Sequence, residues 1–398
     1  MASMRYYLVA RAPLFAVAFL VAAGCSEESE SPLGPEPIPA LATGTAAATL
    51  FFTQVSAGDY HTCAVTPENR AYCWGENWAG QLGNGTGTSS NKPVPVAGGL
   101  RFLQVSAGGS FTCGITTSNK AYCWGLSLFG SLGTGTGSGS SVPVAVAGGR
   151  SYRMIRAGYD HTCAVTLFNV GFCWGKNVFG ELGINSTVSS SGVPVRVVGG
   201  LQWQRINAGG HYSCGVTTDQ RAYCWGSNDD GNLGDGTYSQ RRKPVPVAGG
   251  LRFRLVVAGG GGYSDGQFTM AGPAHTCGVT TENKGYCWGQ MASSPSATPA
   301  PIPGTSRRWQ QVVAGSHTCG VTLADVPFCW GTEPVRVTGG HLFTNVTTGV
   351  GDPPYGGGAH SCGLTSGNRV YCWGDNASGQ LGDGTRTRRL SPVAVVGP

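Results

Sequence analysis

Apolar residues occur along this chain in short runs that are separated by glycine-rich turns. Typical runs are LRFLQVSAG at residues 100–108 and PVPV at residues 93–96. No stretch of the repeated part has the 3.6-residue period of an amphipathic helix, and short runs bounded by turns are typical of β-strands. The chain contains 66 glycines, which are concentrated in the turns. The pattern therefore predicts an all-β fold of short strands.

The runs are organised in a unit that occurs seven times, and each unit contains two cysteines with nine residues between them. The first copy reads HTCAVTPENRAYCWG at residues 61–75, and a Trp-Gly pair follows the second cysteine in every copy. The pairs are Cys63 and Cys73, Cys113 and Cys123, Cys163 and Cys173, Cys214 and Cys224, Cys277 and Cys287, Cys319 and Cys329, and Cys362 and Cys372. The repeats are expected at about 49–99, 100–150, 151–200, 201–250, 251–307, 308–341 and 342–398. Constant inner spacing over seven copies indicates a tandem array.

Each cysteine pair is predicted to lie on a β-hairpin. When Cys63 faces Cys73, Pro67, Glu68 and Asn69 remain for the turn. Three-residue hairpin loops commonly end in a left-handed residue, and Asn tolerates that conformation better than most residues. Directly opposed residues have Cα atoms about 4.5–5.5 Å apart, which a disulfide can bridge. We therefore expect seven disulfides within the hairpins, in an oxidising compartment. Zinc binding is the alternative, but zinc-binding cysteines usually lie two to four residues apart.

The whole unit is interpreted as four strands. One strand precedes the hairpin, the hairpin supplies two, and the proline-containing run suits an outer edge strand. Four-stranded units of about 50 residues in tandem are typical of a β-propeller, with an open stack of units as the alternative. The repeated aromatic residues, such as Tyr72 and Trp74, are expected to pack between blades.

The N-terminus has the features of a targeting segment. Arg5 and Arg11 precede an apolar run at residues 14–23, as in a secretory signal peptide. The sequence VAAGC that follows resembles a bacterial lipobox, in which the cysteine is acylated. Cys25 is also the one cysteine outside the seven pairs. Ser26 after it resembles the sorting signal of outer-membrane lipoproteins.

These features divide the chain into three parts. Residues 1–24 are predicted to be a signal peptide and residues 25–48 a lipidated flexible tether, because this Ser/Glu/Pro-rich segment has too little apolar surface to form a core. Residues 49–398 are predicted to form the propeller. The expected location is extracytoplasmic, on a lipid anchor in the bacterial outer membrane.

A loop motif between the third and fourth strands completes the repeat. Its best copy is NWAGQLGNGT at residues 77–86, with relatives at 127–136, 177–185, 228–237 and 376–385. The combined pattern, AGxxHTCxVT…YCWGxNxxGQLG[DN]GT…PV, resembles the repeat of the RCC1 (regulator of chromosome condensation) superfamily over about 350 residues. The resemblance implies a closed seven-bladed propeller. The paired cysteines depart from the nuclear members and agree with secretion.

The repeats are irregular at a few points. The fifth and sixth units lack the GQLG loop, and glycine-rich insertions occur at residues 259–274 and 349–359, on one predicted face. Aromatic and polar residues in these insertions are candidate partner-binding residues, unless the insertions are merely solvent-exposed loops. The candidates are Tyr263, Asp265, Phe268, Met270 and Tyr355.

Catalytic and cofactor motifs are missing from the sequence. There is no GxSxG, HExxH or phosphate-binding GxxxxGK[ST] motif, so we expect neither an enzyme nor a cofactor. Five histidines occupy one column of the repeat, and we expect them to form structural hydrogen bonds rather than a metal site. The formal net charge of +6 comes without the dense basic stripe of nucleic-acid binders.

These observations favour a monomeric, lipid-anchored binding scaffold whose partner is a protein or a glycan. The resemblance also implies a second possibility, guanine-nucleotide exchange on a small GTPase, as in the nuclear relatives. No projecting wedge can be matched in the third unit. A third possibility is inhibition of a secreted enzyme, as in a secreted bacterial propeller of this superfamily.

Overall fold

A computed structural model describes residues 50–260, 263–264, 269–270, 274–290, 295–304, 306–349 and 359–398. The described residues form seven four-stranded antiparallel sheets, the blades, and one additional pair of short strands. The only helical segment among them is the short 3-10 turn η1 (Leu128–Gly130). No helix in this described part is long and apolar enough to cross a membrane. The predicted all-β fold is confirmed.

The strands follow the chain from blade to blade. Blade 1 contains β1 (Gln54–Ala57), β2 (His61–Val65), β3 (Ala71–Gly75) and β4 (Ser90–Pro95), and blade 2 contains β5 (Phe102–Ala107), β6 (Phe111–Thr116), β7 (Ala121–Gly125) and β8 (Ser140–Ala145). Blade 3 contains β9 (Tyr152–Ala157), β10 (His161–Thr166), β11 (Gly171–Lys176) and β12 (Ser190–Arg196), and blade 4 contains β13 (Trp203–Ala208), β14 (Tyr212–Thr217), β15 (Ala222–Gly226) and β16 (Arg241–Pro246). Blade 5 contains β17 (Phe253–Ala258), β20 (His275–Thr280), β21 (Gly285–Gly289) and β22 (Ser296–Pro301). Blade 6 contains β23 (Trp309–Ala314), β24 (Thr318–Thr322), β25 (Pro327–Trp330) and β26 (Val335–Arg336), and blade 7 contains β27 (Asn345–Thr348), β28 (His360–Leu364), β29 (Val370–Gly374) and β30 (Arg389–Ala394). The additional pair is β18 (Tyr263–Ser264) with β19 (Thr269–Met270).

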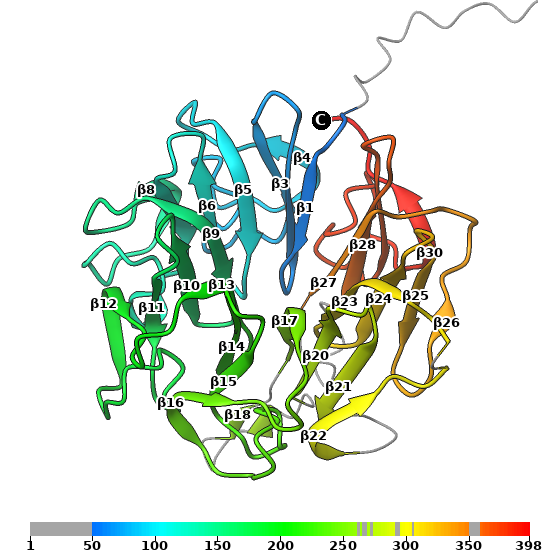
Figure 1. The fold of residues 1–398 in the computed structure, drawn as a ribbon. Coiled ribbons are helices and arrows are strands. Elements are labelled where there is room, and N and C mark those ends of the chain that lie inside the picture. The colour runs from blue at the N-terminus through cyan, green and yellow to red at the C-terminus, as the bar shows by residue number, and fades with distance from the viewer. Residues whose placement is uncertain are drawn as a thin grey trace, which may run out of the picture. The chain divides into compact units, whose positions relative to one another are not determined.

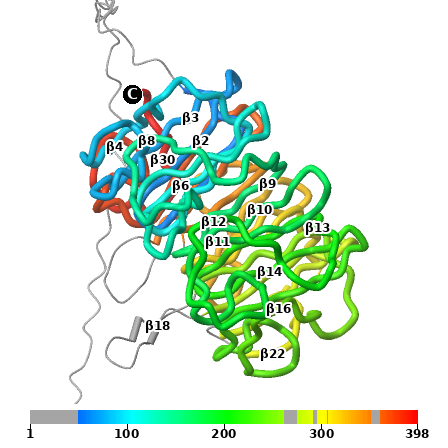
Figure 2. The backbone as a smooth tube through the Cα atoms, turned by 90° about the vertical axis from the view of Figure 1, so that its left-hand side faces the viewer, coloured from blue at the N-terminus to red at the C-terminus, as the bar shows by residue number. Residues whose placement is uncertain are grey.

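The blades close into a ring (Figure 1). The first strand of each blade is innermost and contacts the first strand of the next blade, and β27 of blade 7 contacts β1 of blade 1. At this closure the Ala57 amide donates a hydrogen bond to Thr347 Oγ1 at 3.2 Å. Figure 2 shows the same ring from the side, with β6, β9 and β10, and β14 in successive blades. The fold is therefore a closed seven-bladed propeller, and not an open stack.

The hairpins have the predicted register. Cys63 pairs with Cys73 across β2 and β3, and Asn69 at the end of the turn has a φ of 62°. The same turn position has a positive φ in the other six hairpins, at Asn119, Asn169, Gln220, Asn283, Asp325 and Asn368. The three-residue turn with a left-handed last residue is therefore confirmed in all seven hairpins.

A disulfide joins the two cysteines of every hairpin, as predicted. The seven bonds are Cys63 to Cys73, Cys113 to Cys123, Cys163 to Cys173, Cys214 to Cys224, Cys277 to Cys287, Cys319 to Cys329, and Cys362 to Cys372. Their Cα–Cα distances are 4.0–4.1 Å. The expected distance of 4.5–5.5 Å was wrong on this point, because the bonds hold the paired strands closer together than unlinked opposite residues usually lie.

Most outer strands are longer than predicted, whereas β26 of blade 6 has only two residues. β4 begins at Ser90, three residues before the PVPV run, because Ser90 pairs with Gly75 across an irregularity in the β3–β4 register. The prolines of β4 are tolerated, as expected, because this strand is the outer edge of the sheet.

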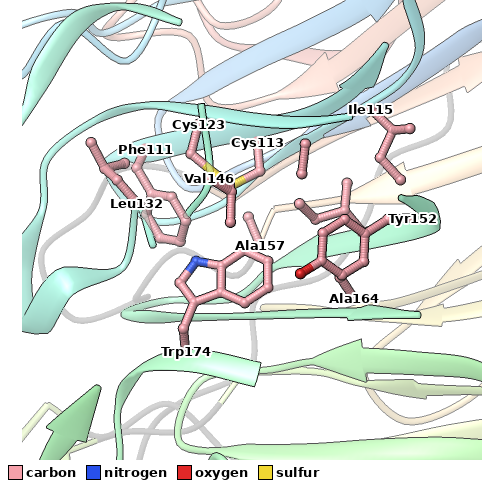
Figure 3. Close-up of a cluster of buried hydrophobic side chains, with 12 residues drawn as sticks. Phe111, Cys113, Ile115, Cys123, Leu132, Val146, Tyr152, Ala157, Ala164 and Trp174 are labelled. Carbon is pink, nitrogen blue, oxygen red and sulfur yellow. A yellow bond between two sulfur atoms is a disulfide. The ribbon is translucent and has the colours of Figure 1, made fainter. Parts of the chain in front are cut away.

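The hydrophobic core lies between blades. Figure 3 shows one such interface, where Trp174 of blade 3 packs towards the Cys113–Cys123 disulfide of blade 2. Tyr152 lies in the same cluster, with its ring centroid 6.3 Å from that of Trp174. Trp74 of blade 1 packs in the same way with Cys362 and Cys372 of blade 7, and Trp288 of blade 5 packs with Cys214 and Cys224 of blade 4. The disulfides thus strengthen each hairpin and also form part of the surface on which the next blade packs.

Candidate functional site: the loop face of blades 2 to 4

The two ends of the ring differ in what they carry. Because the strands of a blade alternate in direction, the loops after its first and third strands emerge on one side, which we call the loop face. The three-residue hairpin turns emerge on the other side, which we call the turn face. The motif at residues 77–86 and its relatives therefore lie on the loop face, together with the two points at which the sequence is expanded.

A buried asparagine organises four of these five loops, and Ser127 takes its place in blade 2. The Asn77 side-chain amide donates hydrogen bonds to the carbonyls of Thr86 and Thr88, both at 3.0 Å, and Asn77 Oδ1 accepts one from the Leu82 amide at 2.9 Å. Asn228 and Asn376 make the corresponding bonds in blades 4 and 7. The asparagine of the motif is therefore a structural residue that fixes the loop conformation.

Each of these loops also braces the following blade. The carbonyl of Gln81 accepts hydrogen bonds from Trp124 Nε1 and from Thr112 Oγ1, both at 2.9 Å. The same tryptophan bond occurs at four more interfaces, Trp174 to Ser131, Trp225 to Glu181, Trp288 to Asn232 and Trp74 to Gln380, at 2.8–3.0 Å. We call this contact the loop brace. Loops held at both ends in this way present their side chains in fixed positions.

The histidine column also joins neighbouring blades. His61 Nε2 hydrogen-bonds Thr112 Oγ1 at 2.7 Å, and His161, His275, His317 and His360 bond equivalent hydroxyls at 2.7–2.8 Å. Burial lowers the pKa of His61 and His161 to about 3, so these rings are neutral at pH 7. The expected structural role is consistent with this geometry.

One group in the described residues has the spacing of metal ligands. His317, Cys319 and Cys329 have ligand atoms within 4.8 Å of one another. Cys319 and Cys329 are joined in a disulfide, however, so they offer no thiolate while this bond is intact.

An aromatic cluster occupies the loop face of blades 2 to 4. It consists of Phe129 on the blade 2 loop, Tyr159 and Phe179 on blade 3 loops, Lys176 at the end of β11, and His211 of blade 4. Lys176 Nζ lies 5.4 Å from the Phe129 ring centroid and 5.9 Å from that of Phe179. The His211 ring lies 5.6 Å from Phe179 and 6.0 Å from Tyr159, measured between centroids. Residues from three blades thus form one contiguous group, which we call the aromatic cluster, with Phe129 and Tyr159 exposed at 44% and 36%.

Phe129 is the most unusual member of the aromatic cluster. Its side chain is 44% exposed, and its φ of 56° lies in the left-handed region that bulky residues rarely adopt. Such strain persists only where the surrounding structure enforces it, and it is concentrated at functional sites. Phe129 thus keeps its ring in solvent in a backbone conformation that asparagine or glycine would adopt with less strain.

Charged groups lie beneath the aromatic cluster. Lys176 Nζ is 3.8 Å from Asp160 Oδ2, and both side chains are largely buried. Glu181 Oε2 accepts a hydrogen bond from the Phe179 amide at 2.8 Å, whereas the buried Oε1 has no hydrogen-bond partner among the described residues. Burial raises the pKa of Glu181 to about 7 and raises the pKa of Asp160, and it lowers the pKa of His211 to about 3.

The charge pattern of the blade 3 loop differs from that in blades 1 and 7. Blades 1 and 7 have Gln81 and Gln380 where blade 3 has Glu181, and these glutamines donate hydrogen bonds to Glu76 and Asp375. Blade 3 has Lys176 in place of those acids. Blade 3 therefore combines a buried titratable carboxyl group, a buried cation and exposed aromatic rings.

The partner-binding candidates predicted from sequence belong to the fifth and seventh repeats. Tyr263 and Met270 are paired across β18 and β19, and nothing further is described for them. Asp265, Phe268, Tyr355 and the proposed lipidation site Cys25 lie outside the described residues. The aromatic cluster was not predicted. Its signal in the sequence is a phenylalanine directly before the first glycine of the loop, at 129 and 179, where blades 1, 4 and 7 have Ala79, Asp230 and Ser378.

Several solved structures share this fold. Human WBSCR16 is 19% identical, with a TM-score of 0.67 over 77% of this chain and 86% of that one. Prp20p from Saccharomyces cerevisiae, whose binding to Gsp1p and histones has been described, is 14% identical, with a TM-score of 0.65 over 87% of each chain. The CRINKLY WD40 ectodomain of the Arabidopsis thaliana receptor kinase ACR4 is 22% identical, with a TM-score of 0.52 over 82% of this chain and 96% of that one. At these identities the likeness establishes the fold alone.

Sequence comparisons give the family. No curated protein matches the chain. Two family profiles do match it, and both are described as the Regulator of chromosome condensation (RCC1) repeat. One matches residues 52–81, 102–131, 203–232 and 356–380, and the other matches residues 68–115, 118–165 and 219–264. Together they cover just over half of the chain, which belongs to the RCC1 repeat family.

Proposed function

We propose that this protein is a non-catalytic scaffold that docks a protein partner on the aromatic cluster of blades 2 to 4. The observation that carries the proposal is a group of exposed aromatic rings on loops that are braced against the next blade. Aromatic side chains are enriched in the buried centres of protein interfaces, and pre-ordered side chains lose little entropy on binding. Lys176 Nζ, which lies 5.4 and 5.9 Å from the Phe129 and Phe179 ring centroids, would help to hold these two rings in place.

Relatives of this fold support a protein partner. Prp20p binds Gsp1p and histones, and the same yeast protein has been crystallised with Kap60. A captured GTPase would favour the exchange-factor role that the resemblance implies, and a captured secreted enzyme would favour inhibition. Binding to a glycan and to no protein would contradict the proposal.

The proposed location is the bacterial cell envelope, with the chain anchored through acylated Cys25. Seven disulfides support an oxidising compartment, because such bonds rarely persist in a reducing cytosol. The test is Cys25→Ser in the native host. Transfer of the protein from the membrane fraction to the soluble fraction is expected, and unchanged membrane association would contradict lipidation.

The docking proposal is tested by cross-linked capture from the native envelope with the full chain as bait. Phe129→Asn removes the exposed ring and places a residue that tolerates the left-handed conformation at this position. The matched control is Phe168→Asn, since Phe168 is 83% exposed on the turn face of blade 3. The proposal predicts a partner that the wild-type chain and the control retain and that Phe129→Asn loses.

The two variants also separate binding from folding. We expect the Phe129→Asn chain to be at least as stable to heat as the wild type, because its backbone strain is relieved. A partner retained by Phe129→Asn and lost by Phe168→Asn would place the binding surface on the turn face and overturn the proposal.

A further inference from the structure

The innermost strands of all seven blades enclose a central channel with a volume of about 850 Å³. This volume falls within the range of small-molecule sites in proteins, about 300–1,000 Å³. The channel is separate from the aromatic cluster, none of whose members line it.

Among the described residues, the charged side chains of the channel wall are confined to blades 3 to 5. In blades 1 and 2 the polar side chains of the wall include Gln54, Ser56, Gln104 and Ser106, and in blades 5 and 6 they are Arg254, Gln310 and Gln311, beside apolar residues such as Leu255. Four arginines line the wall, Arg153 and Arg156 in blade 3, Arg205 in blade 4 and Arg254 in blade 5. No aspartate or glutamate is among the described residues that line the channel.

The polar side chains of blades 1 and 2 are used within the ring. Gln54 Nε2 donates to the Val105 carbonyl at 3.0 Å, and Gln54 Oε1 accepts from the Val105 amide at 3.1 Å. Ser106 Oγ accepts from the Ala157 amide at 3.0 Å. These residues join neighbouring inner strands and have little capacity left for a ligand.

Two of the arginines are also used in this way. Arg153 Nη2 donates to the carbonyls of Trp203 and Gln204 at 2.7 and 2.8 Å. Arg254 Nη2 donates to the Trp309 carbonyl at 2.8 Å, so it joins blade 5 to blade 6 as Arg153 joins blade 3 to blade 4. We therefore assign Arg153 and Arg254 to the structure of the ring.

Arg156 and Arg205 are different, because most of their donors are unused. Arg156 donates one hydrogen bond, to the carbonyl of Ile155 on its own strand, at 3.0 Å. Arg205 has no hydrogen bond or ion pair within the described part of the chain. Burial and, to a lesser extent, the charge of Arg205 lower the pKa of Arg156 to about 10, so the Arg156 guanidinium group remains charged at neutral pH.

We propose that Arg156 and Arg205 bind the phosphate or sulfate group of a small molecule in the central channel. The planar guanidinium group presents several N–H donors in an arrangement that matches oxyanions, and here these donors face a recess without a compensating carboxylate. Like charges that share a confined space repel each other, and a bound dianion would relieve this repulsion. Arg153 and Arg254 would add to the positive potential of the channel.

The proposal is tested by isothermal titration calorimetry of the full chain carrying Cys25→Ser with inorganic pyrophosphate and with sulfate, at constant ionic strength. Arg156→Gln and Arg205→Gln are each expected to weaken binding at least tenfold. Arg336→Gln is the control for net charge, because Arg336 is exposed on β26 and does not line the channel. This control is expected to bind as the parent does.

Three results would overturn the proposal. They are undetectable binding of both anions, equal weakening by the Arg336 control, and unchanged binding by the double variant of Arg156 and Arg205. Vesicles of phosphatidylcholine with phosphatidylglycerol provide a further arm, since binding to these and not to pyrophosphate would indicate a membrane-surface site instead of the channel.

Stability without ligand distinguishes a ligand-binding role from a structural one. If Arg156 and Arg205 serve a ligand, their replacement by Gln relieves repulsion, and the melting temperature without anion should be unchanged or raised. A fall in the melting temperature of either variant would assign these residues to the structure of the ring and contradict the proposal.

Discussion

The blades that follow a GQLG-type loop differ from the blades that do not. Five tryptophans, Trp74, Trp124, Trp174, Trp225 and Trp288, lie next to such a loop, are fully buried, and donate to its carbonyl. The corresponding residues of blades 6 and 7 follow the two units that lack the loop. Trp330 Nε1 is buried without a hydrogen-bond partner among the described residues, and Trp373 is 8% exposed.

The same contrast extends to the cysteines. Cys329 of blade 6 is only partly buried, whereas Cys163 and Cys173 of blade 3 are completely inaccessible. The loop is therefore part of the packing between blades and not only a surface connection. Where it is present it closes the interface, and the aromatic cluster lies on the side of the ring where consecutive loops are present.

The largest loss of stability is expected from replacing the tryptophans at the blade interfaces. Trp124→Ala should lower the free energy of unfolding by about 3–5 kcal/mol, as is usual for a buried aromatic residue. Trp373→Ala should cost about 1 kcal/mol less, because it breaks no loop brace. Denaturant unfolding without reductant measures both values. Equal losses would show that the loop brace adds nothing to the interface.

The free energy of unfolding is expected to depend on pH through Glu181. A carboxyl group whose pKa rises from 4.5 to about 7 on folding binds more protons in the folded state between these pH values, so stability falls as pH rises through this window. Glu181→Gln removes this loss, and it should stabilise the protein by up to about 3 kcal/mol at pH 8.

Measurements at pH 4 and a matched variant in blade 1 are the controls for Glu181. At pH 4 the Glu181→Gln and wild-type proteins should have nearly equal stability, because Glu181 is then protonated in both the folded and the unfolded chain. Gln81→Glu should introduce a pH dependence of the same sign and larger size into blade 1, because Glu76 lies there in place of Lys176. A stabilisation by Glu181→Gln that is equal at pH 4 and pH 8 would contradict the account of Glu181.

A smaller loss of stability is expected from replacing a loop glycine that lies against the tryptophan of the next blade. A Cβ atom on Gly83 would lie 2.5 Å from Trp124 Nε1, whereas one on Gly98 would meet nothing within 4 Å. Both glycines have positive φ, 69° and 86°, so Gly→Ala introduces backbone strain at either position. Gly83→Ala should cost about 1–3 kcal/mol more than Gly98→Ala, because it overpacks the interface. Thermal unfolding of the two variants measures this difference, and equal losses would contradict a close fit.

The fold could be predicted because its determinants are local and are repeated seven times. A constant gap of nine residues and a left-handed residue such as Asn69 define one hairpin register, and both can be read from a single unit. The aromatic cluster could not be predicted in this way, because Phe129, Lys176 and His211 meet only when three blades pack side by side. The pKa of Glu181 likewise depends on burial by neighbouring elements. Arg156 and Arg205 are brought to one channel by different strands.

The proposed function depends on a loop face that is ordered before a partner binds. Hydrogen–deuterium exchange of the full chain, followed peptide by peptide under non-reducing conditions, tests this most directly. We expect slower amide exchange in β10, β11, β14 and β15, which lie between loop braces, than in the corresponding strands β24 and β25 of blade 6. Exchange in blade 6 that is as slow as in blades 3 and 4 would contradict this expectation, because the loop braces would then not be what orders the face.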